Sequence, residues 1–245
     1  MFKLIFGALI SVLSLAAHAA PNINVGNIFD YLDGSQSTFL KRIYNSGDST
    51  AFVRVNISEI IYKDGTRTEL PLATEGPFNM RKGLVASPAR LIIPAGGTQA
   101  TRLLYIGDRD RERYYRVRYV PVVPEKEDQF AVSEQEREAY KTELSAAVNV
   151  LASYGAIFFV HPTDTRFDTR IDDNKIRYSV HNAGNSTIVL DQFRDCSSSD
   201  ERDCAATRLH HVLPGKTHAF DKQPGRVYRF NLVESSQRRS VSVEG

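Results

Sequence analysis

One apolar segment in the middle of the chain, LSAAVNVLASYGAIFFVHP over residues 144–162, most constrains how this sequence can fold. It follows a long polar stretch, ends at a proline, and is flanked on both sides by short segments typical of β-strands. In an extended strand, small apolar side chains share one face at period two, and these are Ala146, Val148, Val150 and Ala152. The opposite face is also partly apolar, so the strand needs cover on both sides. It is either buried in its own sandwich or offers these side chains to another protein along a sheet edge.

The first nineteen residues have the pattern of a secretory signal peptide. Lys3 precedes an apolar stretch, and the Ala17-His18-Ala19 ending predicts cleavage after Ala19. We therefore expect residues 1–19 to be removed and the mature chain to be exported. No later run approaches the roughly 20 apolar residues of a membrane-spanning helix, so no such helix is predicted.

Short segments with alternating apolar and polar residues predict an all-β protein. In AFVRVNISEI, residues 51–60, the alternation places one face in a core and the other in water. About seven such segments, separated by turn signals, precede the proline at 162, and this spacing is typical of a sandwich. A second series follows. We expect an N-terminal domain at 20–162 and a smaller C-terminal domain at 163–245.

The connection over residues 125–143 is strongly polar, with the segments EKEDQ and SEQEREAYKTE in and around it. Ser133 and Glu136 have the spacing of a capping box, and Tyr140 and Leu144 have helical spacing, so a short helix is one interpretation. We favour a mobile loop, because the charges leave little apolar face to bury.

The two cysteines of the chain, Cys196 and Cys204, predict one local disulfide. An exported chain meets an oxidising compartment, in which such a pair closes a small loop. The alternative, a zinc site, needs further Cys or His ligands at metal spacing, but His210 and His211 are adjacent in sequence. We therefore expect no metal.

Neither the charge nor the motifs of the chain indicate an enzyme or a nucleic-acid-binding protein. The formal net charge is +2, too close to neutral to argue for nucleic acid or an anionic membrane as the main partner. The sequence has no nucleophile elbow, no zinc-protease motif and no phosphate-binding glycine loop. We expect no catalytic residues and no cofactor.

Several segments, in this order, resemble a known family. They are INVGNIF, IYNSGDSTAFVRVNI, SPARLIIPAGGTQATRLLYIG, ERYYRVRY, YGAIFFVHP, YSVHNAGNSTIVL and CSSSDERDC followed by VLPGK. Their order is similar to that of the PapD-like periplasmic pilus chaperones, within them the alternate branch that serves the common pilus. The resemblance covers nearly the whole mature length. It implies two immunoglobulin-like β-sandwich domains, set at an angle that forms a cleft.

The resemblance also implies a mechanism and two partners. The last strand of the first domain, here about residues 145–160, would enter the groove of an incomplete pilin subunit in the periplasm. The comb residues, Ala146, Val148, Val150 and Ala152, would fill the pockets left by the missing strand of the pilin. Main-chain bonds would supply affinity and the comb would supply register. Delivery of the pilin to an outer-membrane usher would follow.

Better-known members anchor the C-terminal carboxylate of the pilin with an arginine in the first strand and a lysine late in this last strand. This chain departs from that pattern, because INVGNIF has no basic residue and Ile157 stands at the late position. The candidates for the anchor are therefore other cations within strand-like segments: Arg116, Lys41 and Arg102.

Alternative functions stay open at the level of sequence. A secreted immunoglobulin-like pilin, adhesin subunit or binding module would share the export signal and the β pattern, but a pilin lacks a strand and this chain has a full set. A β-sandwich hydrolase would need a clustered acid and base, which the sequence does not indicate. Exposed edge strands also invite pairing with a second copy, so a self-capping homodimer is an open alternative.

The disulfide can be tested by intact mass. Reduction should raise the mass by two hydrogen atoms if Cys196 and Cys204 are joined, and equal masses would refute the pairing. A closed loop of this size should stabilise the protein by about 2 kcal/mol, at the low end of the usual range.

Overall fold

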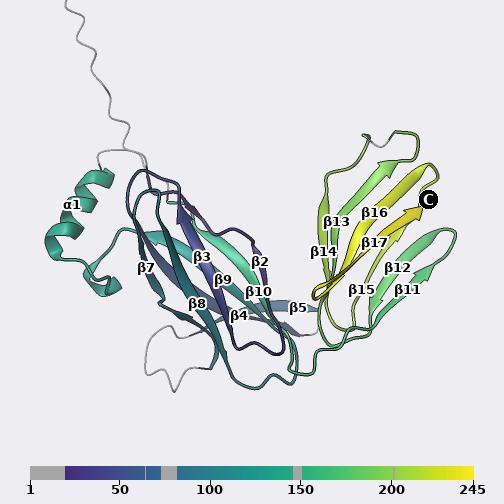
Figure 1. Cartoon of the computed structure of the whole chain (residues 1–245), viewed down its shortest axis with the longest axis horizontal. Helices are drawn as coiled ribbons and strands as arrows, with labels where there is room; N and C mark the ends of the chain where they lie inside the picture. The colour runs from purple at the N-terminus through teal and green to yellow at the C-terminus, as the bar shows by residue number, and fades with distance from the viewer. Residues whose placement is uncertain (1–19, 64, 73–81, 146–150, 201) are drawn as a thin grey trace, which may run out of the picture.

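The computed structural model describes residues 20–245 except 64, 73–81, 146–150 and 201. Figure 1 shows two β-rich units joined in sequence, with helix α1 (Glu134–Ser145) at the end of the first unit that lies away from the second. Within the described residues, no helix has the length and apolar character that a membrane span requires.

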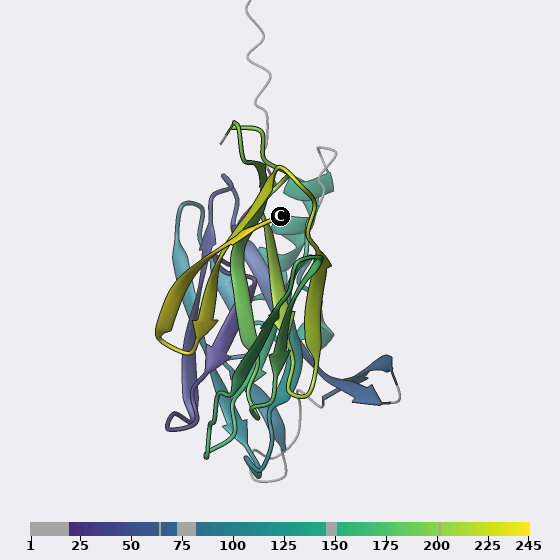
Figure 2. The same cartoon turned by 90° about the vertical axis from the view of Figure 1, so that its right-hand side faces the viewer.

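Two sheets form the first unit. The four-stranded sheet has the order β1 (Ile23–Asn24), β3 (Thr38–Asn45), β8 (Thr98–Ile106) and β6 (Gly83–Ser87). The six-stranded sheet runs β2 (Phe29–Leu32), β10 (Tyr154–Val160), β9 (Arg113–Val122), β4 (Ala51–Lys63) and β5 (Thr66–Pro71), and β7 (Arg90–Ile93) pairs with β4. Their facing sides bury one apolar core that includes Ile43, Val53, Leu103 and Phe158. Figure 2 shows the hairpin of β4 and β5, in blue, projecting to one side of this unit.

The second unit repeats this design on a smaller scale. One sheet contains β11 (Thr169–Asp173), β12 (Arg177–Asn182) and β15 (Thr217–Asp221). The other contains β14 (Arg208–Val212), β13 (Ile188–Ser197), β16 (Arg226–Glu234) and β17 (Gln237–Glu244). A separate core lies between them, around Ile188, Leu190 and Phe230. The prediction of two all-β sandwiches is confirmed, and the domain boundary at residue 162 stays a prediction.

Strand β10 lies between β2 and β9 in the six-stranded sheet. It pairs in parallel with β2 from Ile157 opposite Phe29, and antiparallel with β9 from Tyr154 opposite Tyr119. The segment Tyr154–Ala156 therefore precedes the part of β10 that lies beside β2. The strand expected from about residue 145 begins at Tyr154 in this structure.

The preference for a loop over residues 125–143 is wrong, because a 3-10 turn (Lys126–Asp128) and helix α1 (Glu134–Ser145) form there. The Ser133 N–H donates to Glu136 Oε2 at 2.7 Å, and the Glu136 N–H donates back to Ser133 Oγ at 3.2 Å. This capping box satisfies backbone donors at the start of the helix.

Tyr140 anchors helix α1 to the sandwich. Tyr140 is buried, its ring lies 4.8 Å from that of Phe52, and its hydroxyl donates to the Thr50 carbonyl at 2.8 Å. Phe130, from the same connection, packs against Phe52 beside it. A helix with many charges is thus held by a small aromatic cluster at the end of the sandwich.

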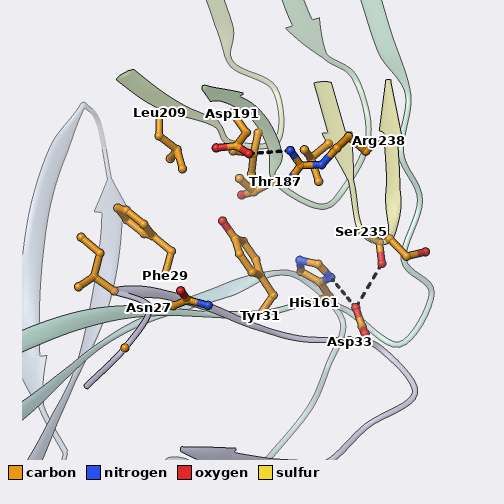
Figure 3. A pocket seen from close by; sticks show the side chains of 15 residues that line it. Asn27, Phe29, Tyr31, Asp33, His161, Thr187, Asp191, Leu209, Ser235 and Arg238 are labelled. Carbon is orange, nitrogen blue, oxygen red and sulfur yellow. Dashed lines mark hydrogen bonds and ion pairs between the residues drawn. The ribbon is translucent and has the colours of Figure 1, made fainter. Parts of the chain in front are cut away.

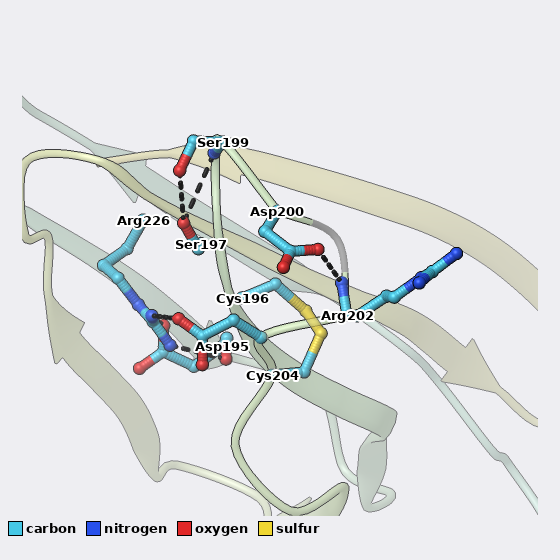
Figure 4. Close-up of a disulfide and its surroundings, with 9 residues drawn as sticks. Asp195, Cys196, Ser197, Ser199, Asp200, Arg202, Cys204 and Arg226 are labelled. Carbon is cyan, nitrogen blue, oxygen red and sulfur yellow. Dashed lines mark hydrogen bonds and ion pairs between the residues drawn. A yellow bond between two sulfur atoms is a disulfide. The ribbon is translucent and has the colours of Figure 1, made fainter.

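The predicted disulfide is confirmed. Cys196 and Cys204 are joined, with an S–S distance of 2.02 Å, and Figure 4 shows the bond within a loop that leaves β13. Arg226 holds the base of this loop through Asp195, with Nε 2.8 Å from the carboxylate. Among the described residues, no group of three or more His, Cys, Asp or Glu side chains could hold a metal ion.

The capping box yields a stability prediction for α1. Ser133→Ala removes the side-chain acceptor for the Glu136 N–H and should destabilise the helix by about 1 kcal/mol. Hydrogen exchange of the α1 amides measures this loss. Ser133→Thr keeps the hydroxyl and should restore most of the protection; equal exchange in all three proteins would contradict the role of the cap.

Candidate functional site

The outer face of the six-stranded sheet points toward the second domain. Core residues of β9 and β10 alternate with residues on this outer face, as Phe158 and Phe159 illustrate. The Phe159 ring stacks on His211 of β14 with 4.8 Å between centroids, and on Tyr31 of β2 at 4.9 Å. The Tyr31 hydroxyl is hydrogen-bonded to His211 Nε2 at 2.7 Å. An aromatic stack therefore joins the two domains.

A buried carboxylate makes a second contact between the domains. Glu112, just before β9, accepts hydrogen bonds from the Thr187 N–H at 2.8 Å and from the Thr187 hydroxyl at 2.5 Å. The Tyr114 hydroxyl also donates to it, at 2.7 Å. Burial raises the pKa of Glu112, whereas the hydrogen bonds from Thr187 and Tyr114 oppose that shift. These bonds fix how the second domain meets the end of the first.

Arg109 holds together the loops at this junction. Its guanidinium donates only to backbone carbonyls in the contacts described, those of Leu32, Asp33, Gln36 and His161. Leu32 ends β2, Asp33 and Gln36 belong to the turn after it, and His161 follows β10. One side chain thus ties the ends of two neighbouring strands.

A cavity of about 820 Å³ opens between the domains (Figure 3). Ile28, Phe29 and Leu209 form an apolar part of its wall, and Ile28 is 52% exposed. The polar part includes an ion pair between Arg238 and Asp191 at 2.9 Å. The two domains therefore border a cleft with both apolar and charged walls, as expected from the resemblance.

Two arginines of β9 converge on one carboxylate on the outer face of the sheet. Arg116 Nε lies 2.8 Å from Glu69 Oε1, and Arg118 Nη2 lies 2.7 Å from Glu69 Oε2. Arg67 also contacts Glu69, at 2.7 Å. The hydrogen bond from Arg116 has the largest effect on the pKa of Glu69; burial opposes it, the hydrogen bond from Arg118 adds to it, and the pKa is lowered to about 2. The carboxylate is therefore ionised at any physiological pH.

The structure places the three candidate anchors apart. Arg116 lies on the face that carries Tyr114 and Phe159, and its side chain passes over Gly155 of β10. Lys41 is only 4% exposed and binds Asp30 at 2.7 Å, so it serves as a buried counter-ion within the first domain. Arg102 lies on β8 in the other sheet, beside Leu40 and Leu104. Of these three, Arg116 alone lies on the sheet face through which Phe159 contacts the second domain.

The comb falls mostly outside the described residues. Ala146, Val148 and Val150 are not described, and Ala152 is exposed in the connection before β10. Next to this connection, β9 continues past its pairing with β10, from Val120 to Val122, while β4 still pairs with its other edge. No described strand lies on the β10 side of this part of β9. Among the described residues, this part of β9 therefore has no strand partner on the side where the comb segment joins β10 at Tyr154.

Sequence reasoning missed several residues of this region. Arg118 could have been found, because period two places it on the same face as Arg116. Glu69 could not be assigned, since its contact with β9 depends on the register of β5 against β4 and of β4 against β9. Glu112 and Thr187 meet only through the packing of two domains, for which the sequence carries no local signal.

Comparisons with known proteins agree with the fold. No family model matches the chain. The chain is 28% identical over 212 residues to a CS1 fimbrial subunit of Escherichia coli, and the match covers 85% of this chain and 84% of the relative. It is 25% identical over 213 residues to the probable fimbrial chaperone EcpB of Klebsiella pneumoniae, with 86% of each chain covered.

Solved structures show the same architecture. The class 5 fimbriae chaperone CfaA matches with a TM-score of 0.53 and 21% identity over 90% of this chain and 98% of that one. The Escherichia coli chaperone DraB matches with a TM-score of 0.54 and 12% identity, over 92% and 98%. The resemblance to PapD-like fimbrial chaperones, which are assembly proteins and not enzymes, is confirmed.

The aromatic stack predicts a pH-dependent stability. Burial lowers the pKa of His211 to about 4, and it also lowers that of His161, whose ring lies 6.1 Å from that of Tyr31. Both folded-state pKa values lie below the unfolded value of 6.5, so the unfolded chain binds more protons in this window. Stability should therefore be complete above pH 6.5 and fall as the pH drops toward 4.

Urea unfolding at several pH values tests this expectation. His211→Phe keeps an aromatic ring against Phe159 but removes one titrating group, so the variant should lose less stability than the wild type between pH 6.5 and 4. An identical pH dependence of the two proteins would contradict the assignment.

Proposed function

We propose that this protein is a periplasmic chaperone that lends a strand to fimbrial subunits and delivers them to an outer-membrane usher. The observation that carries the proposal is the edge of β9 at Val120–Val122, which no described strand covers and which lies just beyond Tyr154, where the segment that bears the comb joins β10. A client strand and the comb segment can extend the sheet there through main-chain hydrogen bonds. The alternating side chains would then set the register of the client.

The first domain has what a strand donor needs and a strand acceptor lacks. Both of its sheets face a continuous buried core, in which Val53, Tyr115 and Phe158 are at most 1% exposed. A domain that lacked one strand would leave part of such a core open. This supports a role for the chain as the donor, and argues against the alternative of a pilin or adhesin subunit.

Arg116 is our candidate for the residue that binds the C-terminal carboxylate of the client. It lies on the cleft face, it is partly exposed, and Arg118 stands beside it. A guanidinium group suits this task because its planar donors can bind both oxygens of a carboxylate. Phe29 of β2 and Ile157 of β10 lie opposite each other. Neither side chain is charged, so this pair of positions cannot bind the carboxylate.

The proposed partners follow from the names of similar proteins. A structure of the Salmonella enterica SafA pilin in complex with the SafB chaperone matches this chain with a TM-score of 0.50 and 12% identity. By analogy, the partner of this chain would be an incomplete pilin, and the usher would receive it. The predicted signal peptide agrees with a periplasmic location. Self-capping as a homodimer stays a prediction.

Co-expression with a fimbrial subunit from the same genome tests the function, with recovery of the periplasmic complex as the measurement. Val150→Arg places a charge in what should be a dry pocket of the client, at a cost of several kcal/mol, and should abolish the complex. Asn149→Arg, on the opposite face of the same segment, is the matched control.

The anchor is tested in the same assay. Arg116→Ala should weaken the complex by about 2 kcal/mol, the usual loss for a hydrogen bond to a charged group. Arg102→Ala removes a strand arginine from the other sheet and should have little effect. No complex with any subunit, or one that survives Val150→Arg unchanged, would overturn the proposed function.

A further inference from the structure

The guanidinium group of Arg116, which we assign to the client, and that of Arg118 beside it already bind a carboxylate of the chain itself. Glu69 lies on β5, two strands away from β9, and reaches across β4 to Arg116 and Arg118. Between them on β4 is Ser58, which pairs with Arg116 on one side and with Pro71 on the other. A small side chain at this point lets the two charged groups meet above the sheet.

The cluster carries more positive than negative charge. Three arginines, at 67, 116 and 118, surround the single carboxylate of Glu69 within the described contacts. At neutral pH the four groups therefore sum to two positive charges, and a second anion would be attracted to them. An oxyanion of the carboxylate class fits the forked donors of two neighbouring guanidinium groups.

The contacts of Glu69 are open to exchange. Its side chain is 25% exposed, and those of Arg116 and Arg118 are 22% and 43% exposed. Strand β5 is an edge strand with mostly exposed residues, held on one side by β4, and Figure 2 shows this hairpin extending away from the sandwich. Water and a dissolved anion can therefore reach the cluster, and β5 has few contacts that would resist a shift of the Glu69 side chain.

We propose that Glu69 is an internal competitor, which occupies the carboxylate site of Arg116 and Arg118 in the free protein and yields it to the client carboxylate. The proposal rests on the proposed function, and it adds a regulation of the same site. Glu69 keeps the two arginines paired and positioned while the cleft is empty. After release of a client, it returns to the site, so the arginines never stand unpaired in the cleft.

Binding of a model carboxylate tests the proposal without a client. N-acetylglycine reproduces the end of a peptide chain, and N-acetylglycinamide is its uncharged control. The NMR signals of the arginine Nε–H groups report binding to the folded protein. Glu69→Gln should bind N-acetylglycine about tenfold more tightly than the wild type, and the amide should bind neither protein.

Glu59→Gln is the matched control variant. Glu59 lies on β4, next to the position that pairs with Glu69, but it contacts Arg113 at 3.4 Å on the core side of the sheet. The substitution removes the same charge from the same hairpin. The affinity of this variant should equal that of the wild type, and Arg116→Ala combined with Glu69→Gln should lose the gain in affinity.

Three results would overturn the proposal: equal affinity of the wild type and Glu69→Gln, an equal gain in Glu59→Gln, or no binding to any of the proteins. The complex with a fimbrial subunit is measured separately. A client complex that needs Arg116 but ignores Glu69→Gln would leave the function in place and refute the competitor. Tight binding of N-acetylglycine by Glu69→Gln without any client complex would support competition by Glu69 for the carboxylate site and refute the proposed function.

Discussion

Strand β10 is the element on which the rest of the structure depends, because both of its faces are buried at its end, from Phe158 to Val160. Phe158 lies in the core of the first sandwich, and the next residue, Phe159, stacks against His211 of the second domain. Period-two alternation thus makes one strand a part of the core and of the domain junction at once. Its pairing with β9 also determines which part of β9, Val120–Val122, has no described strand partner on that side.

The charged groups of the first domain divide into two classes by exposure. The side chains of Lys41 and Asp30 are both 5% exposed, and Lys41 also donates to the Asn27 carbonyl. This pair is therefore a structural part of the first domain. Removal of one partner from such a pair leaves an uncompensated buried charge. The pairs of Glu69 are exposed, and exposed pairs contribute little to stability. They are therefore better suited to exchange with a ligand.

Much of this architecture could be predicted from the sequence, because the alternation of apolar and polar residues and the turn signals are local features of the chain. The two sandwiches and the disulfide follow from such patterns. Helix α1 was missed because its few apolar residues looked insufficient, and only the fold shows that Tyr140 meets Phe52 from a distant strand. Arg116 was among the predicted anchors, whereas Glu69 was not, since strand register decides which side chains meet across three strands.

Arg109 recognises the main chain, and this affects how the protein can diverge. In the contacts described, its guanidinium binds backbone carbonyls, so the side chains at Gln36 and Asp33 contribute nothing to those bonds. The sequences of the loops at the domain junction can therefore change during evolution while the hydrogen bonds of Arg109 are kept. The arginine itself has no such freedom, because a lysine lacks the planar set of donors that reaches several carbonyls at once. Conservation of Arg109 alone is therefore enough to keep the junction in place while the side chains of the surrounding loops change.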